Sequence, residues 1–285
     1  MQALFFGLGY SSSRTADMMA ETGTYARLYG TRRSLAASGP AIPLVFDGTA
    51  PGPEVGKTLR NGITHVILSV APDADGDLVL RHHRADLDAA QDLQWLCYFS
   101  TVGVYGDFGG DWIDETAPLS PKNARSAWRV KAEDQWRTFA AARGVPLCIF
   151  RLAGIYGPGR SGFDKLRDGT ARRIIKQGQV FNRIHVDDIA RVTMLAAQQR
   201  LAGTFNLADD LPAPPQDVVE HAADLIGAPV PPDMPFETAD LSPMARSFYA
   251  DNKRVSNAAI KSALGIELLY PNYRAGLAAI LKDEQ

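Results

Sequence analysis

The chain has 285 residues, a formal net charge of −2, and ordinary shares of hydrophobic (46%) and charged (22%) residues. This composition is typical of a globular protein with a sizeable core, and no basic run indicates a nucleic-acid surface. No apolar stretch approaches the roughly 18 residues that a membrane helix needs, and no basic segment precedes the first apolar run as in a signal peptide. Cys97 and Cys148 lie in apolar runs without metal-ligand spacing, so we expect a cytoplasmic protein without a metal site.

The first apolar run, residues 3–6, leads directly into Gly7-Leu-Gly9 and three serines. A buried strand, a tight turn and a helix N-terminus in this order attract phosphate, because backbone N–H groups and the helix dipole point at it. Gly7 permits the turn and Gly9 leaves room for a pyrophosphate, while Ser12 stands where a third glycine is usual and a serine could cap the helix. The segment predicts a dinucleotide site; an ordinary strand-to-helix turn is the alternative. The expected contacts are Gly7, Gly9, Tyr10, Ser11 and Ser12.

A second strand, beginning near residue 25, ends in Thr31-Arg32-Arg33. Dinucleotide folds that prefer NAD carry an acidic residue about here to hold the ribose 2′-hydroxyl, and none is present. A guanidinium can instead pair with a 2′-phosphate in a bidentate manner. The segment therefore predicts NADP, with Thr31, Arg32 and Arg33 as contacts; NAD, with two solvated arginines, is the alternative.

Two further strands are expected at residues 41–46 and 65–70. The second of them is apolar throughout, as in a parallel sheet that helices cover on both faces. Asp47 follows the first, where it would contact adenine or form a turn. Ligands of open α/β folds bind at the carboxyl ends of strands, so the expected contacts also include Ser69, Val70 and Ala71. The predicted fold is a doubly wound parallel sheet of the Rossmann type.

A fifth strand, residues 93–100, runs into Phe99-Ser-Thr-Val-Gly-Val-Tyr-Gly-Asp107. Three more segments follow in order: Asp114-Glu-Thr-Ala-Pro118, Arg151-Leu-Ala-Gly-Ile-Tyr-Gly-Pro-Gly159, and His185-Val-Asp-Asp-Ile-Ala190. This series resembles the extended short-chain dehydrogenases/reductases, which include nucleotide-sugar epimerases and dehydratases. The resemblance extends from Gly7 to about Leu207.

The resemblance implies an NAD(P)-dependent oxidoreductase or epimerase-like enzyme that acts on a small hydroxyl- or carbonyl-bearing or sugar-nucleotide-like substrate. It implies that Thr101, beside Ser100, hydrogen-bonds the reacting oxygen; satisfying loose backbone groups at the strand end is the alternative. It also implies a dinucleotide-binding domain (residues 1–154 and 184–207) and a smaller substrate lobe (155–183 and 208–285). A homodimer through helices near residues 77–93 and 122–142 would follow as well.

One family feature is missing. The Tyr-x-x-x-Lys pair of these enzymes falls on Arg125 and Arg129, and shifting the register to Lys131 places Ala127 at the tyrosine. Arginine stays protonated and cannot replace the phenol as a proton shuttle, although Arg129 could hold a ribose or phosphate and Arg125 could polarise a carbonyl. Tyr105 or Thr101 could donate the proton, or the substrate could need none. The remaining alternative is a non-catalytic NADP(H)-binding sensor or scaffold.

Overall fold

The computed structural model describes residues 1–35 and 39–284. They fall into two compact units: unit 1 comprises Met1–Val104, Asn123–Arg151 and Ile189–Phe205, and unit 2 comprises Tyr105–Lys122, Leu152–Asp188 and Asn206–Gln285. The sequence-based domain boundaries stay a prediction. No helix in the described part of the chain is long and apolar enough to cross a membrane.

Unit 1 is built on a seven-stranded sheet with the order β11-β7-β5-β4-β1-β2-β3. β1 pairs in parallel with both β2 and β4, and β3 and β5 extend the sheet in parallel on either side. The chain therefore builds outward through β2 and β3 and then crosses to the other side of β1. In open α/β sheets such a reversal leaves a crevice at the carboxyl ends of the strands. The predicted fold class, a doubly wound parallel sheet, is confirmed. The strands are β1 (Gln2–Phe6), β2 (Arg27–Arg32), β3 (Ile42–Val45), β4 (His65–Leu68), β5 (Trp95–Thr101), β7 (Leu147–Leu152) and β11 (Gly203–Leu207).

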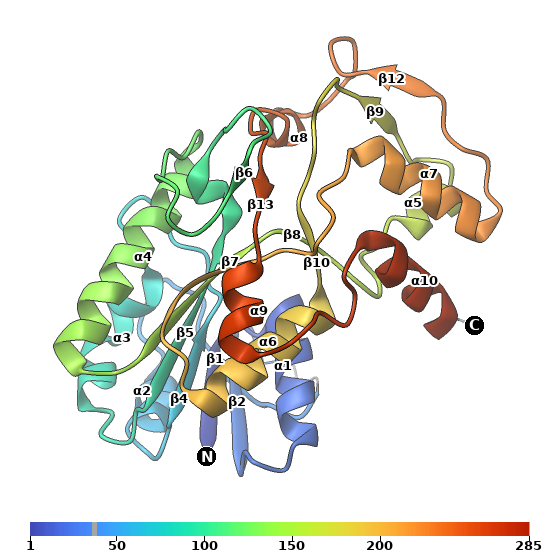
Figure 1. The fold of residues 1–285 in the computed structure, drawn as a ribbon. Coiled ribbons are helices and arrows are strands. Elements are labelled where there is room, and N and C mark those ends of the chain that lie inside the picture. The colour runs from blue at the N-terminus through green and yellow to red at the C-terminus, as the bar shows by residue number, and fades with distance from the viewer. Residues whose placement is uncertain (36–38, 285) are drawn as a thin grey trace. The chain divides into compact units, whose positions relative to one another are not determined.

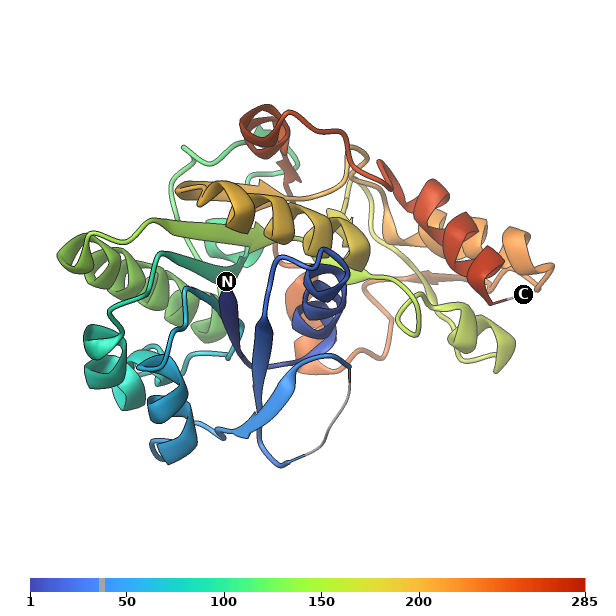
Figure 2. The same ribbon diagram turned by 90° about the horizontal axis from the view of Figure 1, so that it is seen from below.

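Helices cover both faces of this sheet: α2, α3 and α4 lie on one face, and α1 and α6 lie on the other (Figures 1 and 2). On the second face, Trp95 of β5 connects the sheet to the segment after α6, because its indole Nε1 donates to the carbonyl of Leu201 at 2.8 Å. A 3₁₀ turn, Val102–Tyr105, follows β5. The helices are α1 (Tyr10–Glu21), α2 (Pro53–Leu59), α3 (Leu78–Ala89), α4 (Ala124–Arg143) and α6 (Val186–Gln199).

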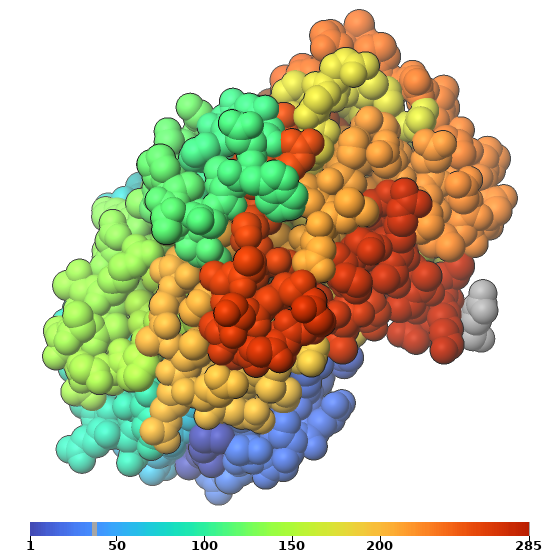
Figure 3. All heavy atoms as spheres, in the orientation of Figure 1, coloured from blue at the N-terminus to red at the C-terminus, as the bar shows by residue number. Residues whose placement is uncertain are grey.

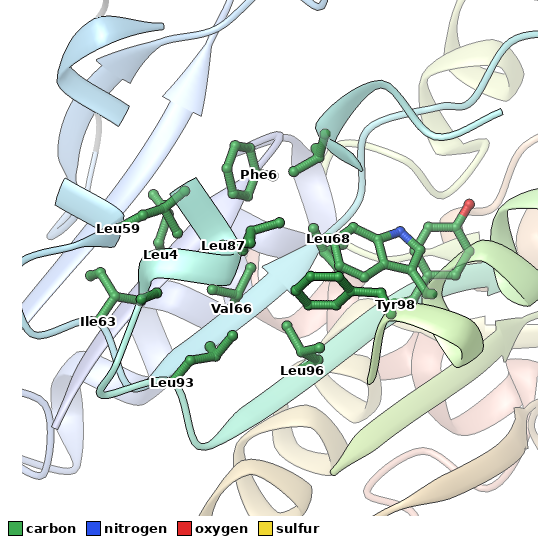
Figure 4. Close-up of a cluster of buried hydrophobic side chains, with 14 of the residues drawn as sticks. Leu4, Phe6, Leu59, Ile63, Val66, Leu68, Leu87, Leu93, Leu96 and Tyr98 are labelled. Carbon is green, nitrogen blue, oxygen red and sulfur yellow. The ribbon is translucent and has the colours of Figure 1, made fainter. Parts of the chain in front are cut away.

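The core of unit 1 lies between the sheet and the first of these helix layers. Figure 4 shows Leu4, Val66 and Leu96 from three neighbouring strands facing side chains of the helices. α4 contributes Trp136 and Phe139, which are fully buried and lie about one helical turn apart. This packing fixes α4 against β5 and so sets the position of the helix that carries Arg125 and Arg129.

Unit 2 is built from short elements around smaller apolar clusters. β6 and β13 pair in parallel, with Trp112 opposite Arg254, and the loop that carries β6 lies against β13 in the space-filling view (Figure 3). β8 pairs with β10, and β9 pairs with β12. The elements are β6 (Trp112–Ile113), β8 (Gly154–Tyr156), α5 (Phe163–Arg167), β9 (Arg173–Ile175), β10 (Arg183–His185), α7 (Pro215–Ile226), β12 (Asp233–Pro235), α8 (Pro243–Phe248), β13 (Arg254–Val255), α9 (Ala258–Leu264) and α10 (Tyr273–Asp283).

Candidate functional site

The glycine turn after β1 is held by hydrogen bonds from both neighbouring strands. Gly7 has φ +85°, a conformation that glycine adopts without strain. Its N–H donates to Thr31 Oγ1 at 2.9 Å, and its carbonyl accepts from Ser69 Oγ at 2.7 Å. A Cβ at Gly7 would come within 3.0 Å of Ser69 Oγ. The turn is therefore fixed by β2 and β4 before any ligand binds.

Ser12, at the position of the third glycine, connects α1 to this turn. Its side chain is 1% exposed, and its hydroxyl donates to Ser69 Oγ at 3.0 Å. Ser69 thus accepts from α1 and donates to Gly7, and Thr31 is equally buried at 1%. Ser12, Thr31 and Ser69, predicted as cofactor contacts, use these hydroxyls to hold the turn in shape.

The N-terminus of α1 has the features of a phosphate site. The helix begins at Tyr10, its N-cap is Gly9, and no side chain caps it, so the expected serine cap is wrong. The reason is that the chain becomes helical directly after Gly9, which leaves the serines inside the first turn. The first turn contains no acidic residue, and a Cβ at Gly9 would meet no atom within 4 Å. An uncapped helix end beside open space attracts a diphosphate. Tyr10 is about one-third exposed, whereas Ser11 is buried.

The two arginines at the end of β2 differ in their surroundings. Arg32 is half-buried and its Nη2 donates to Ser13 Oγ at 3.4 Å, and Arg33 is exposed. Both follow directly on the strand that braces the glycine turn. This position is consistent with a 2′-phosphate contact, which stays a prediction.

Asp47, expected to contact adenine or to form a turn, forms a turn. Its Oδ1 accepts from the Thr49 N–H at 2.9 Å and from the Thr49 hydroxyl at 2.7 Å. These hydrogen bonds lower the pKa of the Asp47 carboxyl. At the end of β4, Val70 is half-buried and Ala71 is exposed. The cofactor contacts expected of Asp47, Val70 and Ala71 stay predictions.

Ser100 lies at the carboxyl end of β5, and its hydroxyl is engaged by a buried carboxylate. It is 5% exposed and donates to Glu133 Oε1 of α4 at 2.6 Å. Glu133, which is fully buried, also accepts from Arg151 Nη2 at 2.8 Å and from Arg137 Nη2 at 2.9 Å. Burial raises the pKa of the Glu133 carboxyl, but Arg151, the Ser100 hydroxyl and Arg137 outweigh it and hold that pKa below its usual range. Ser100 therefore anchors the strand end to α4.

Thr101, the next residue, is half-buried and not engaged in this way. Its Oγ1 accepts from the Gly103 N–H at 3.1 Å, which leaves the hydroxyl proton for another acceptor. Arg125 is exposed in the first turn of α4. Arg129 Nη1 donates to the Tyr98 hydroxyl at 3.0 Å and to the Phe99 carbonyl at 2.8 Å. Arg129 thus ties α4 to β5, and a cofactor contact would have to use its other nitrogen atoms.

Tyr105, a candidate proton donor, is part of unit 2 and fully buried. Its hydroxyl donates to Asn206 Oδ1 at 2.7 Å. Next to it, the Gly106 carbonyl accepts from the buried Lys253 Nζ at 2.6 Å, and Asp107 Oδ1 accepts from the Asn252 N–H at 2.8 Å. A buried phenol whose proton is already shared cannot reach a substrate in this conformation. The Val-Tyr-Gly-Asp segment accordingly has a structural explanation, which sequence spacing could not reveal because its partners lie about 100 residues or more away.

Comparisons with known proteins agree with this architecture. A model of the NAD-dependent epimerase/dehydratase family matches residues 80–208. A curated Streptomyces protein, named 3-diazoavenalumate denitrifying reductase, is 28% identical over 178 residues, and the match covers 58% of this chain and 58% of the relative. A solved structure of a conserved protein of unknown function from Silicibacter pomeroyi is 46% identical, with a TM-score of 0.89 over 100% of this chain and 99% of that chain. A protein from Methylobacillus flagellatus, described as an NAD-dependent epimerase/dehydratase, is 26% identical, with a TM-score of 0.75 over 99% and 98% of the two chains.

Proposed function

We propose that this chain is a member of the NAD-dependent epimerase/dehydratase family, whose model matches residues 80–208, and that it is an NADP-dependent reductase of small carbonyl-bearing or related substrates. The observation that carries the proposal is the phosphate cradle at the sheet reversal: Gly7 is held in its turn from both sides, and Gly9 opens onto free space at an uncapped helix end. A nicotinamide dinucleotide bound there by its diphosphate would extend along the carboxyl ends of the strands.

The residues divide into three roles. The Gly9 end of α1 binds the diphosphate, and Arg32 and Arg33 bind the 2′-phosphate. Thr101 donates a hydrogen bond to the substrate oxygen, since its hydroxyl proton is uncommitted, whereas Ser100 and Arg129 keep the end of β5 and α4 in register. When bound, the reduced cofactor supplies a hydride to the substrate.

The proposal is tested by titrating NADPH into the purified protein and following its fluorescence, then measuring NADPH oxidation with a panel of acceptors. The panel contains 9,10-phenanthrenequinone, an aromatic aldehyde, UDP-glucose and an aryl diazonium salt. The diazonium salt is included because the Streptomyces relative is named for a diazo substrate; replacing the diazonium group by hydride releases N₂ and consumes no proton, which suits a site without a phenol. Micromolar binding with turnover of one acceptor is expected, and no binding at millimolar NADPH would refute the proposal.

Cofactor choice is the second expected result. Replacing Arg32 and Arg33 together by alanine should weaken NADPH binding by about 10- to 100-fold, since the charge-assisted contact of the half-buried Arg32 contributes about 1.5–3 kcal/mol and that of the exposed Arg33 adds little. NADH lacks the 2′-phosphate, so its Kd should not change. The control is Arg27→Ala at the exposed start of the same strand. Equal losses for both cofactors would show that the arginines do not recognise the 2′-phosphate.

The homodimer stays a proposal, and the charged surface of unit 1 indicates which interactions would hold it together. Exposed positions of α3 and α4 carry Arg81, Arg84, Asp88, Lys131 and Asp134. A contact between these helices would rest on ion pairs, which salt screens. We expect any dimer to dissociate as the NaCl concentration is raised from about 0.05 M to about 1 M, because the Debye length then falls to about 3 Å. Sedimentation velocity measures this dissociation, and a salt-independent dimer would place the interface elsewhere. A cytoplasmic location is likewise proposed, supported by Cys97 and Cys148, which are free and buried thiols.

A further inference from the structure

Ser126, in the first turn of α4, has a hydroxyl for which the described part of the chain supplies no hydrogen-bond partner. Its side chain is 7% exposed, and its backbone N–H donates to the N-cap residue Asn123 at 2.9 Å. Within residues 1–35 and 39–284 its hydroxyl makes no hydrogen bond. The Ser126 oxygen is not one of the fully buried side-chain atoms that lack a partner, so a ligand or water can reach it.

The Ser126 hydroxyl lies next to Gly103. A Cβ at Gly103 would lie 2.8 Å from Ser126 Oγ and 3.4 Å from Thr101 Oγ1. The two hydroxyls therefore flank the same side of Gly103, the side where every other residue has its side chain. Gly103 does not have a positive φ, so the backbone does not require glycine here. What the missing side chain provides is room for the Ser126 hydroxyl, which lies against Gly103 on the same side as the Thr101 hydroxyl.

We propose that Ser126 is a second catalytic hydroxyl, which together with Thr101 holds the reacting oxygen of the substrate. The inference rests on the proposed reductase function. Hydroxyls donate to oxygen at about 2.7–2.8 Å, and one oxygen lying just outside Gly103 can accept from both. The N-terminus of α4 adds the positive end of its dipole, which favours an oxygen that gains negative charge.

This pair binds the oxygen but does not supply a titrating proton, because serine and threonine hydroxyls stay protonated at neutral pH. In a carbonyl reduction the hydride and its two electrons add to the carbon, the C=O pair moves to the oxygen, and that oxygen takes a proton from water. The pair therefore takes over the hydrogen-bonding part of the missing phenol's role and leaves proton supply to solvent.

Two substitutions test the assignment. Ser126→Ala removes the donor, and Gly103→Ala fills the space with a methyl group. Each should lower kcat for the best acceptor of the panel by roughly 100-fold, the usual effect of losing one oxyanion donor, with the Kd for NADPH unchanged. The matched control is Thr138→Ala on the exposed face of α4, where the hydroxyl bonds only to its own helix at Asp134; this variant should keep wild-type kcat.

A crystal structure of the NADP⁺ complex decides the assignment independently of turnover. We expect a water or ligand oxygen within hydrogen-bond distance of both Ser126 Oγ and Thr101 Oγ1, and its absence from Gly103→Ala. A Ser126 hydroxyl bonded to a protein group instead, or a Ser126→Ala variant that binds NADPH and turns over normally, overturns the inference alone. Failure of the wild-type protein to bind NADPH would refute the proposed function itself.

Discussion

Thr101→Ala should lower kcat by roughly 100-fold or more while the Kd for NADPH stays within about twofold of wild type. The reason is positional: Thr101 is the last residue of β5, at the edge of the sheet where the cofactor cradle also lies, and its hydroxyl proton has no acceptor of its own in unit 1. Its Oγ1 meanwhile accepts from the Gly103 N–H. The substitution therefore removes the substrate contact without touching the glycine turn.

Thr101→Ser is the matched control, because it keeps the hydroxyl and removes only a methyl group. It should retain most of the wild-type kcat. Stopped-flow measurement of NADPH oxidation separates hydride transfer from cofactor binding, which equilibrium fluorescence reports. If Thr101→Ala turned over like the wild type, the hydroxyl would have only its backbone role. A protein that binds NADPH tightly and shows no turnover with any acceptor, wild type included, would be a sensor or scaffold.

Glu133→Ala should be the most destabilising single substitution in unit 1. Glu133 and Arg151 are 0% and 3% exposed, and the ion pair between them is shared with Ser100 and Arg137. Removing one partner of a buried pair leaves an uncompensated charge and costs about 3–5 kcal/mol. For a chain of this size that loss corresponds to a fall in Tm of roughly 10 °C, which differential scanning calorimetry measures.

Asp134→Ala is the comparison for this substitution. Asp134 is the next residue of α4 and also pairs with Arg137, but its side chain is 68% exposed. Exposed pairs contribute about 0–1 kcal/mol, so this variant should unfold close to the wild-type temperature. Similar Tm values for the two variants would show that the buried pair contributes nothing special to the stability.

The same carboxyl predicts how acid affects the protein. The pKa of Glu133 is lower in the folded chain than in the unfolded chain. Its contribution is therefore fully present above the unfolded-state pKa of about 4.3 and is lost as the pH falls through the lowered folded-state pKa. Between about pH 5 and about pH 3, an interval that includes the unfolded-state pKa of glutamate, the wild type should lose more stability than Glu133→Ala.

The sequence was sufficient wherever the signal is local. Gly7, Gly9 and the helix after them form one continuous segment, and short-range sterics alone require a strand, a left-handed glycine and a helix start in that order. The apolar runs at 3–6, 65–70 and 93–100 likewise predict strands, and β1, β4 and β5 lie there in the structure. The resemblance to the extended short-chain dehydrogenases/reductases follows from the order of four motifs along the chain.

Tertiary structure alone decided which of the predicted side chains remain available for chemistry. Ser100 and Thr101 are neighbours with similar hydroxyls, yet Glu133 engages only Ser100, because alternate residues of a strand face opposite sides of the sheet. The Tyr105 hydroxyl donates to Asn206, and the Ser126 hydroxyl lies against the side of Gly103 where another residue would carry its side chain. Such pairings depend on how distant segments pack, and a hydroxyl's function depends on whether that packing has already provided its hydrogen-bond partner.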